Sequence, residues 1–327
     1  MAEAFDVVAI GEVMALLDPE ESGPLEDVSR FRLRIAGAEG NVLINLSHLG
    51  HSTAFVSAVG SDPLGHLVTR TLAEQGVNTD HVRVDPAGRT GVFFKERLGD
   101  GERRVYYYRD GSAASRLRPD QLDLDQLGVP RVLTLSGVTL GLGDGTGLSK
   151  VARKALDWAA GQSCQVVFDP NLRPSLWHGA RAIDEFAEIL PQIDVLLAGR
   201  EELAALMPAA EPEDAARSLC EAGMTSVVLK DGARGAVVHD GGGSTRIEAY
   251  PVGPVVDPVG AGDAFAAGVI SGLLHDWPVR YGAQVGAVLG ARAVTVSGDW
   301  ESVETGGGAQ QLLDEYQAAS RYVGAHE

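Results

Sequence analysis

Hydrophobic residues along this chain follow two alternating patterns. Short runs rich in β-branched and other apolar residues predict buried strands, and these runs lie at 7–10, 54–59, 132–135, 166–168, 195–198 and 227–229. Amphipathic stretches with helical spacing separate or follow them, at 41–49, 64–75, 148–160, 182–190 and 212–222. Strands that alternate with helices in this way are typical of a parallel sheet covered on both faces. The pattern therefore predicts an α/β protein with a mostly parallel central sheet flanked by helices.

One region breaks this alternation. Two β-rich runs at 90–98 and 102–109 flank Gly99-Asp100-Gly101, and Asp-Gly between strands is a strong signal for a tight hairpin turn. A hairpin of two strands is not stable by itself. We therefore expect a small β-sheet lid, formed by about residues 14–36 and 88–112, that packs over the main domain. The alternative is a peripheral hairpin whose tyrosines serve only for packing.

The strand period of two assigns the side chains of the second run to opposite faces of the hairpin. Val105, Tyr107 and Arg109 fall on one face, and Tyr106 and Tyr108 fall on the other.

The last third of the chain is predicted to be helical, at 261–274, 282–296 and 310–322. The length of 327 residues fits one large α/β domain with an elaboration or two modest domains, and we expect residues 1–327 to form a single domain. An exposed lid edge favours self-association, and we expect a homo-oligomer, either a dimer or a larger assembly.

Charge and composition exclude several classes of partner. The 27 Lys and Arg residues against 45 Asp and Glu residues give a formal net charge of −18, which repels nucleic acid and anionic membranes. No window approaches the roughly 20 apolar residues that span a bilayer, and the acidic N-terminus is unlike a signal peptide. A cytoplasmic location is expected. The two cysteines, Cys164 and Cys220, form neither a disulfide framework nor a metal motif, and we expect both to be buried as small hydrophobic residues.

The most informative motif is Asp257-Pro258-Val259-Gly260-Ala261-Gly262-Asp263, which leads directly into an apolar stretch at 264–274. A glycine-containing turn that opens a helix presents unpaired backbone N–H groups and the positive end of the helix dipole, which together favour anions. Asp263 adds a carboxylate that can accept a proton from a hydroxyl group. These two functions together suit phosphoryl transfer. The alternative is a structural turn in which Asp263 only caps or charges the first helical turn.

The whole string, continued by Ala264-Phe265-Ala266-Ala267-Gly268, resembles the C-terminal signature of the ribokinase-like (PfkB) carbohydrate kinases, and the resemblance covers roughly residues 6–300. It implies a three-layer ribokinase-like fold, ATP as phosphoryl donor and Mg2+ as its metal, while a requirement for K+ stays open. It also implies that Asp263 is the general base. The backbone N–H groups of Gly260, Ala261 and Gly262 would stabilise the transferring γ-phosphoryl group.

Two further segments agree with the resemblance. In Ala36-Gly37-Ala38-Glu39-Gly40-Asn41, the family resemblance makes Gly37 and Asn41 sugar contacts, whereas by itself the segment reads as a loop with Asn41 as a helix cap. Asp169-Pro170-Asn171-Leu172-Arg173 follows a predicted strand, and ligands of open parallel sheets bind beyond such strand ends. The resemblance implies substrate and nucleotide-phosphate contacts there, from Arg173 and Asn171 respectively.

Two more segments predict the part of the site that binds the nucleotide and its magnesium ion. Glu202 matches a family residue that helps to hold magnesium and its water ligands near the phosphates, although Gly199 replaces the usual Asn. Lys230, Gly232 and Gly235 match a family segment that lies along the nucleotide. Each segment has a structural alternative, since an acidic first helical turn explains Glu202 and a glycine hairpin explains the other three residues.

Within the family, the segments 106–113, 135–139 and 169–177 look most like 2-keto-3-deoxygluconate kinases. This similarity implies that Tyr107, Arg109 and Arg173 bind the acid substrate, and arginine is the side chain best matched to a carboxylate. Phe93 lies where that group often has a tyrosine, which could alter substrate choice, and Asp299 matches another acidic position near the substrate.

The resulting expectation is an ATP-dependent kinase that converts 2-keto-3-deoxygluconate to 2-keto-3-deoxy-6-phosphogluconate and ADP. The first alternative is a ribokinase-like kinase for fructose, another keto sugar or a nucleoside, and a second is a non-catalytic sugar-acid or nucleotide sensor. A dinucleotide-dependent oxidoreductase is disfavoured, because Ile10-Gly11-Glu12-Val13-Met14 stands after the first strand in place of Gly-x-Gly-x-x-Gly.

Overall fold

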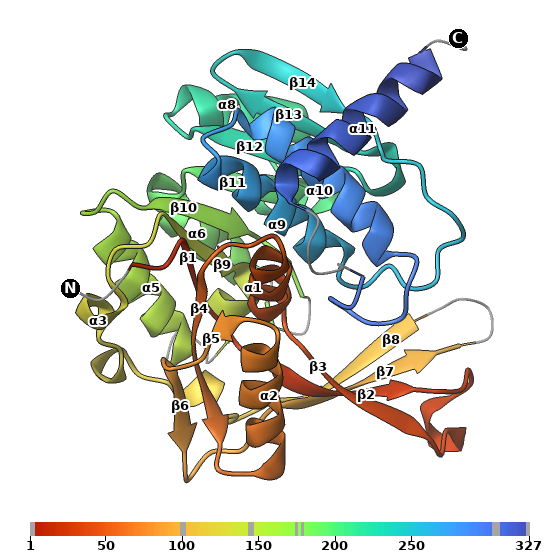
Figure 1. Ribbon diagram of the computed structural model, residues 1–327. Coiled ribbons are helices and arrows are strands. Elements are labelled where there is room, and N and C mark those ends of the chain that lie inside the picture. The colour runs from red at the N-terminus through yellow and green to blue at the C-terminus, as the bar shows by residue number, and fades with distance from the viewer. Residues whose placement is uncertain are drawn as a thin grey trace.

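The computed structural model describes residues 4–98, 103–142, 147–173, 176–177, 180–302 and 308–324. A large twisted sheet lies between two layers of helices, and a second, smaller sheet extends from one side (Figure 1). The predicted α/β architecture is therefore confirmed.

The large sheet has the strand order β14-β13-β12-β11-β10-β9-β1-β4-β5, with β6 also paired to β4. Its strands are β1 (Val7–Ile10), β4 (Thr53–Gly60), β5 (Val77–Asn78), β6 (Val82–Asp85), β9 (Val132–Ser136), β10 (Gln165–Asp169), β11 (Val195–Gly199), β12 (Ser226–Lys230), β13 (Ala236–Asp240) and β14 (Gly243–Ile247). The pairs from β12 across to β5 and β6 are parallel, whereas β12–β13 and β13–β14 are antiparallel. All six predicted strands are present.

Both faces of this sheet are covered by helices that pack their apolar residues against it. One layer contains α1 (Ala38–His48), α2 (Pro63–Glu74), α9 (Ala261–Leu274), α10 (Val279–Ala293) and α11 (Ala309–Gly324). The other contains α5 (Leu148–Ala159), α6 (Ala180–Ile189), α7 (Arg200–Leu206) and α8 (Pro212–Glu221), while α3 (Leu124–Leu127) and α4 (Gly137–Gly141) are short. Within one strand Val7 packs into the first layer and Val8 into the second, which explains why the strands are continuous hydrophobic runs.

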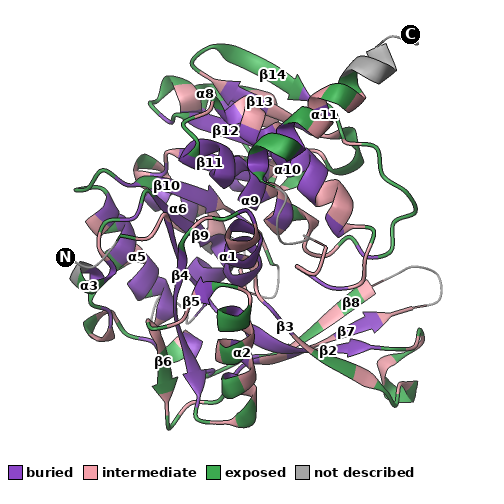
Figure 2. Cartoon of the chain, viewed as in Figure 1, coloured by how far each residue is buried: buried purple, intermediate pink, exposed green. Residues whose placement is uncertain are grey.

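The small sheet is the predicted lid. Its order is β3-β2-β7-β8, with β2 (Met14–Pro19), β3 (Phe31–Ala36), β7 (Val92–Arg97) and β8 (Arg103–Tyr108). Along β8 the residues alternate between half-buried and exposed, and Tyr106 and Tyr108 face solvent, as the strand period predicts (Figure 2). The predicted turn at Gly99-Asp100-Gly101 lies outside the described residues.

Three details differ from or extend the sequence pattern. Helix α10 begins three residues earlier than the pattern predicts, because Pro278 provides its N-cap position. Cys164 is buried, but the prediction that Cys220 is buried is wrong, because Cys220 lies in the last turn of α8 and is only partly covered. No helix in the described part of the chain combines the length and apolar character needed to traverse a bilayer.

Candidate active site

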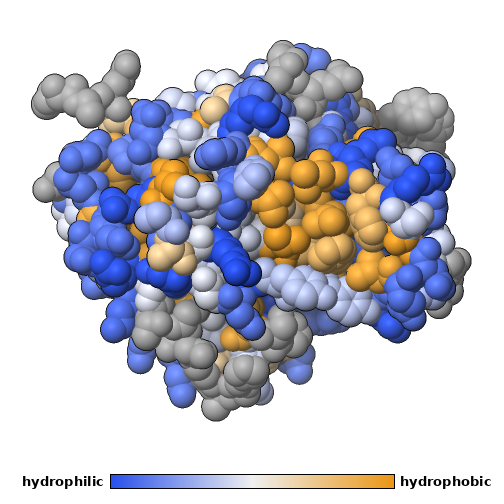
Figure 3. Space-filling model, turned by 90° about the horizontal axis from the view of Figure 1, so that it is seen from below, coloured by the Kyte–Doolittle hydropathy of each residue, from blue (hydrophilic) through white to orange (hydrophobic). Residues whose placement is uncertain are grey.

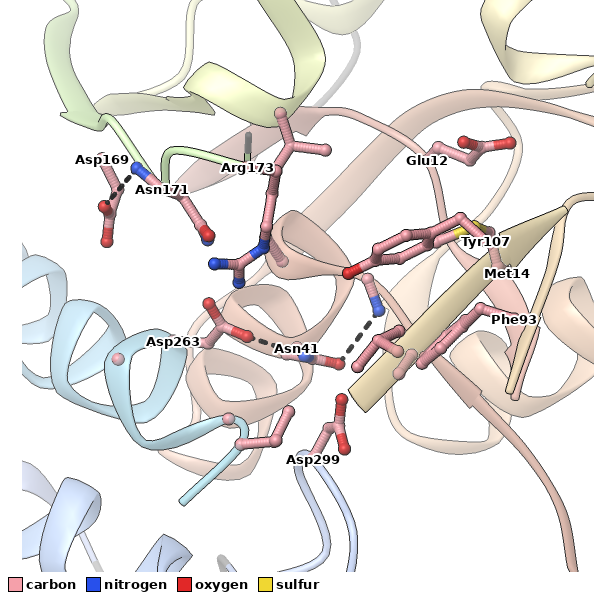
Figure 4. A pocket seen from close by; sticks show the side chains of 18 of the residues that line it. Glu12, Met14, Asn41, Phe93, Tyr107, Asp169, Asn171, Arg173, Asp263 and Asp299 are labelled. Atoms are coloured by element: carbon pink, nitrogen blue, oxygen red, sulfur yellow. Dashed lines mark hydrogen bonds between the residues drawn. The ribbon is translucent and has the colours of Figure 1, made fainter. Parts of the chain in front are cut away.

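A cavity of about 690 Å³ lies between the lid and the carboxyl ends of the central strands. Figure 4 shows the side chains that converge on it from the lid, from the strand ends and from the start of α9. The predicted site residues that line it are Gly37, Asn41, Phe93, Tyr107, Arg109, Asn171, Arg173, Glu202, Lys230, Gly260, Gly262, Asp263 and Asp299. The predicted residues Ala261, Gly232 and Gly235 are not part of its lining. Segments from almost the whole length of the chain thus meet at one place.

The start of α9 forms the floor of this cavity. Gly260 adopts a left-handed conformation with φ of 86°, and a Cβ atom there would lie 2.1 Å from the carbonyl oxygen of Asp299. Only glycine fits such a position. The N–H of Ala264 donates to the carbonyl of Gly260 at 2.9 Å, so the N–H groups of Gly262 and Asp263 come before this first i→i−4 bond. The positive end of a 14-residue helix therefore faces the cavity, as anion binding requires.

Asp263 lies in the first turn of this helix, and its carboxylate points into the cavity (Figure 4). Enclosure away from water raises the pKa of Asp263 to about 7, and repulsion from Asp169 and Asp299 acts in the same direction. A hydrogen bond from Asn41 and the charge of Arg173 oppose this rise in pKa. A carboxylate with a pKa near neutrality is well matched to accept a proton from an alcohol at that pH.

Asn41 connects helix α1 to this carboxylate. Its side-chain nitrogen Nδ2 donates to Oδ2 of Asp263 at 2.7 Å, and its Oδ1 accepts from the backbone N–H of Gly37 at 3.4 Å. The N-cap of α1 is Gly37 and not Asn41, so the interpretation of Asn41 as the helix cap is wrong. The amide is instead used to hold Asp263 in place.

A second polar cluster lies at the ends of β10 and β12. Lys230 Nζ lies 2.5 Å from Oδ2 of Asp169, and Oδ1 of Asp169 accepts from the backbone N–H of Asn171 at 3.0 Å. Burial raises the pKa of Asp169 while the Lys230 ammonium opposes the change. Burial by itself would lower the pKa of Lys230, but attraction to Asp169, Glu202 and Asp263 raises it overall. The ammonium therefore stays charged beside the cavity.

Glu202 borders the same cluster. Its two carboxylate oxygens accept hydrogen bonds from the backbone N–H groups of Leu172, at 2.8 Å, and Gly199, at 2.7 Å. The contact at Gly199 uses only the backbone, so replacing the family's usual Asn by Gly leaves it intact. Each oxygen keeps a second lone pair that can accept from water. Within the described residues no group of three or more His, Cys, Asp or Glu side chains is arranged to hold a metal directly.

The two predicted substrate arginines have different surroundings. Arg109 is buried and pairs with buried Glu12, with Nε and a terminal nitrogen 2.8 and 2.6 Å from Oε2 of that residue. Arg109 also lies 5.6 Å from the ring centroid of Tyr107. Arg173 is exposed, and its guanidinium extends toward Asp263 (Figure 4). Among the described residues, Arg173 has no ion pair.

The aromatic part of the lid closes one side of the cavity. Phe93 on β7 lies opposite Tyr107 on β8, and their ring centroids are 5.7 Å apart at an interplanar angle of 31°. Phe93 is only 5% exposed, so it presents an apolar surface where a tyrosine would present a hydroxyl group.

Sequence reasoning missed several charged residues of this site. Lys95, Arg103 and Glu12 line the cavity, and buried Asp257 contacts Lys95. A signal for Lys95 was available, because the strand period of two places it on the same face as Phe93.

The glycines of the segment after β12 have a structural explanation. Gly235 has φ of 85°, and a Cβ atom there would lie 2.1 Å from the carbonyl oxygen of Ile247. This turn requires glycine whether or not a ligand lies nearby. A nucleotide contact at Gly232 or Gly235 stays a prediction.

Comparisons with known proteins agree with this geometry. The model of the pfkB family carbohydrate kinases matches residues 4–306. The chain is 34% identical to a 2-dehydro-3-deoxygluconokinase of Thermoproteus tenax, covering 95% of each protein, and 32% identical to one of Bacillus subtilis, covering 97% of each. The crystal structure of a PfkB protein from Polaromonas sp. JS666 superimposes with a TM-score of 0.83 at 36% identity, covering 97% of this chain and 100% of that one.

Proposed function

Because this chain belongs to the pfkB family of carbohydrate kinases, and is thus a sugar kinase, we propose that its substrate is 2-keto-3-deoxygluconate, also called 2-dehydro-3-deoxygluconate. ATP would phosphorylate the terminal hydroxyl to give 2-keto-3-deoxy-6-phosphogluconate and ADP. The main support for phosphoryl transfer is that Asp263 lies in the first turn of α9 and has a pKa of about 7.

Asp263 would accept the proton of the attacking hydroxyl group. As the oxygen attacks the γ-phosphorus and the bond to the β-phosphate oxygen breaks, negative charge spreads over the transferring group. The backbone N–H groups of Gly260, Ala261 and Gly262, with the dipole of α9, would stabilise that charge. The N–H of Ala261 lies 3.5 Å from the carbonyl oxygen of Pro258, a long contact that a phosphate oxygen could replace.

The nucleotide would bind beside the strand-end cluster. Lys230 and Asn171 would contact its phosphates, and Gly232 and Gly235 would lie along it. Mg2+ bound with ATP would neutralise phosphate charge, and Glu202 would hold it through its water ligands, because both oxygens of Glu202 already accept backbone hydrogen bonds. A requirement for K+ stays open.

The sugar acid would lie under the lid. Gly37, Asn41 and Asp299 would contact its hydroxyl groups, Phe93 and Tyr107 would pack on its carbon chain, and the arginines would bind its carboxylate. Arg173 is the stronger candidate for the carboxylate, because the charge of Arg109 is already offset by Glu12.

A kinase for a neutral keto sugar such as fructose is the second candidate. The Arg109–Glu12 ion pair and the missing hydroxyl group at Phe93 favour it, because both reduce the polar contacts available to a sugar acid.

A substrate panel distinguishes the two candidates. ADP release would be measured with 2-keto-3-deoxygluconate, its galactose-derived epimer, fructose and a nucleoside, each at matched concentration with ATP and Mg2+. We expect the highest kcat/KM with 2-keto-3-deoxygluconate. A higher value with fructose would establish the second candidate, and binding without turnover of any of them would indicate a sensor.

We also propose that the protein forms a dimer through the outer face of its lid. Among the described residues, the edge strands of the lid sheet, β3 and β8, are each paired on one side only. The outer face of the lid exposes large apolar side chains, including Leu33 at 51% and Tyr108 at 65%. Figure 3 shows an apolar patch on the side of the molecule where the lid lies. A second copy that packs on this face would cover both the edge and the patch, giving a dimer.

A further inference from the structure

Lys95 is a buried cation on the inner face of the lid. It lies on β7 between Phe93 and Arg97, and its side chain is 4% exposed. Its ammonium forms an ion pair with Asp299 and lies 3.3 Å from Oδ2 of Asp257, which is itself 1% exposed. A lid residue therefore joins two acidic residues that belong to the main body of the protein.

These two acidic residues flank the start of α9. Oδ1 of Asp257 accepts from the backbone N–H of Val259 at 3.2 Å, immediately before Gly260. The carbonyl oxygen of Asp299 lies against Gly260 from the other side, so close that no Cβ atom would fit. Any displacement of Asp257 or Asp299 would therefore move the turn that carries the anion-binding N–H groups.

Burial makes this arrangement dependent on the cation. Two carboxylates taken out of water near each other repel, and each has a large desolvation cost unless a positive charge lies between them. Asp257 also has two more distant cations from the lid, Arg103 at 3.7 Å and Arg97 at 4.0 Å, but Asp299 has only Lys95 as an ion-pair partner among the described residues.

Other charged groups strengthen the same junction between lid and body. Arg97 contacts Asp18 at 2.6 Å within the lid and the hydroxyl oxygen of Ser297 in the body at 2.8 Å. Arg34 of the lid pairs with Glu301 of the body. Trp300 also donates its indole N–H to the carbonyl of Ile35 in the lid, at 3.1 Å. Four residues of the segment 297–301 thus contact the lid, and of the lid cations that hold this segment Lys95 lies nearest to Asp257, at 3.3 Å against 4.0 Å for Arg97.

We propose that Lys95 is a positioning residue that couples the seated lid to the phosphoryl-binding turn. Only a seated lid brings the ammonium between Asp257 and Asp299, and only then is Gly260 fixed from both sides. The anion-binding N–H groups are therefore fully oriented only when the lid also covers the sugar and excludes water. This inference rests on the proposed phosphoryl transfer at Asp263 but not on the identity of the sugar.

The test compares Lys95→Met with Arg32→Met. Arg32 is a lid cation with a side chain that is 62% exposed, so its replacement removes the same charge from the same sheet without touching the body. Both variants are assayed with whichever sugar of the panel the wild type phosphorylates fastest, and ADP and sugar phosphate are measured separately. If 2-keto-3-deoxygluconate is not the substrate, another sugar of the panel gives the highest rate, and the role of Lys95 is still tested with that sugar. The two proposals can therefore fail independently of each other.

We expect kcat of Lys95→Met to fall by up to about 100-fold, because a misplacement of about 1 Å can have that effect on rate. The ratio of ADP to sugar phosphate should rise, because ATP hydrolysis by water is no longer excluded. Arg32→Met should resemble the wild type in both quantities. A Lys95→Met variant that is folded and retains the wild-type kcat and ratio would overturn the proposal.

Two further variants separate positioning from general stability. Lys95→Met/Asp257→Asn removes one positive and one negative buried charge, and the Asn oxygen can still accept from Val259, so this variant should fold if the single variant does not. The proposal predicts that it too has low kcat and a raised ratio. In Lys95→Ala, added propylammonium, which replaces the missing part of the side chain, should restore kcat. A double variant with the wild-type kcat and the wild-type ratio of ADP to sugar phosphate would contradict the inference. A folded Lys95→Ala variant whose kcat is not restored by the amine would also contradict it.

Discussion

Asn41 and Asp263 are joined by a hydrogen bond of 2.7 Å although 222 residues separate them in the chain. This bond, donated from α1, holds one oxygen of the carboxylate and leaves the other for an attacking hydroxyl group. The proposed general base lies on a helix of the C-terminal half of the protein and is thus oriented from the N-terminal half.

Replacement of Asp263 by Asn tests the base directly. We expect kcat to fall by about 100- to 10,000-fold, the usual contribution of a positioned proton acceptor, with sugar and ATP affinities changed much less. Steady-state rates and calorimetric binding measure the two effects. Asp276→Asn, at an exposed position just beyond the other end of α9, is the matched control and should retain wild-type kcat. Equal losses of binding and turnover in Asp263→Asn would instead indicate damage to the cavity.

The raised pKa of Asp263 also predicts how stability depends on pH. The folded protein retains a proton on this carboxyl group up to a pKa of about 7, whereas the unfolded chain loses it near 3.8. The folded state therefore binds more protons between these values, and stability falls as the pH rises from about 4 to about 7.

Asp263→Asn removes this dependence. Urea unfolding should find the variant more stable than the wild type by a few kcal/mol (order of magnitude) at pH 8, and by much less near pH 4. A difference that is constant with pH would show that Asp263 has an ordinary pKa in the folded protein.

Asn41→Leu removes the hydrogen bond that lowers the pKa of Asp263 while keeping a side chain of similar size. The pKa of Asp263 should rise further, so the acidic limb of the kcat–pH profile should move to higher pH. At a fixed pH below the midpoint, the ionised fraction of Asp263 falls about tenfold when its pKa rises by about 1. A lower kcat with an unchanged midpoint would assign Asn41 a role in orientation only.

The two arginines should respond differently to replacement. Arg173→Gln leaves no buried charge unpaired, and we expect KM for the sugar acid to rise by about 10- to 100-fold, the value of a hydrogen bond to a charged group. KM for a neutral keto sugar should change little. Arg109→Gln removes the ion-pair partner of buried Glu12 and should destabilise the fold by about 3–5 kcal/mol. Thermal unfolding measured beside the kinetics separates the two cases, and a selective effect of Arg109 on KM would reverse these assignments.

Tyr108→Glu tests the proposed dimer. A charge on the apolar outer face of the lid, at its edge strand β8, should prevent a second copy from packing there, so the molar mass from light scattering should fall from dimer to monomer. Glu74→Lys, at an exposed position at the end of α2 and outside the lid strands, is the control. A wild type that is monomeric at all concentrations refutes the interface.

Much of this protein could be predicted from local sequence patterns. The runs at 7–10 and 195–198 identified strands buried on both faces, because successive side chains enter opposite layers. The motif from Asp257 to Asp263 identified a helix start suited to anions, because its glycines and the first helical turn are neighbours in the chain. Such features depend only on residues a few positions apart.

The partners of the buried charges were decided by the tertiary structure alone. Asp263 with Asn41, Lys95 with Asp299 and Arg109 with Glu12 each join segments about a hundred or more residues apart. The sheet order places β1 between β4 and β9, and the lid is built from strands on both sides of β4 in the sequence, so these segments meet only after the chain has folded. Sequence patterns identify which residues can carry the chemistry, but the pKa of a carboxyl group depends on enclosure and on neighbouring charges, and packing in three dimensions determines both.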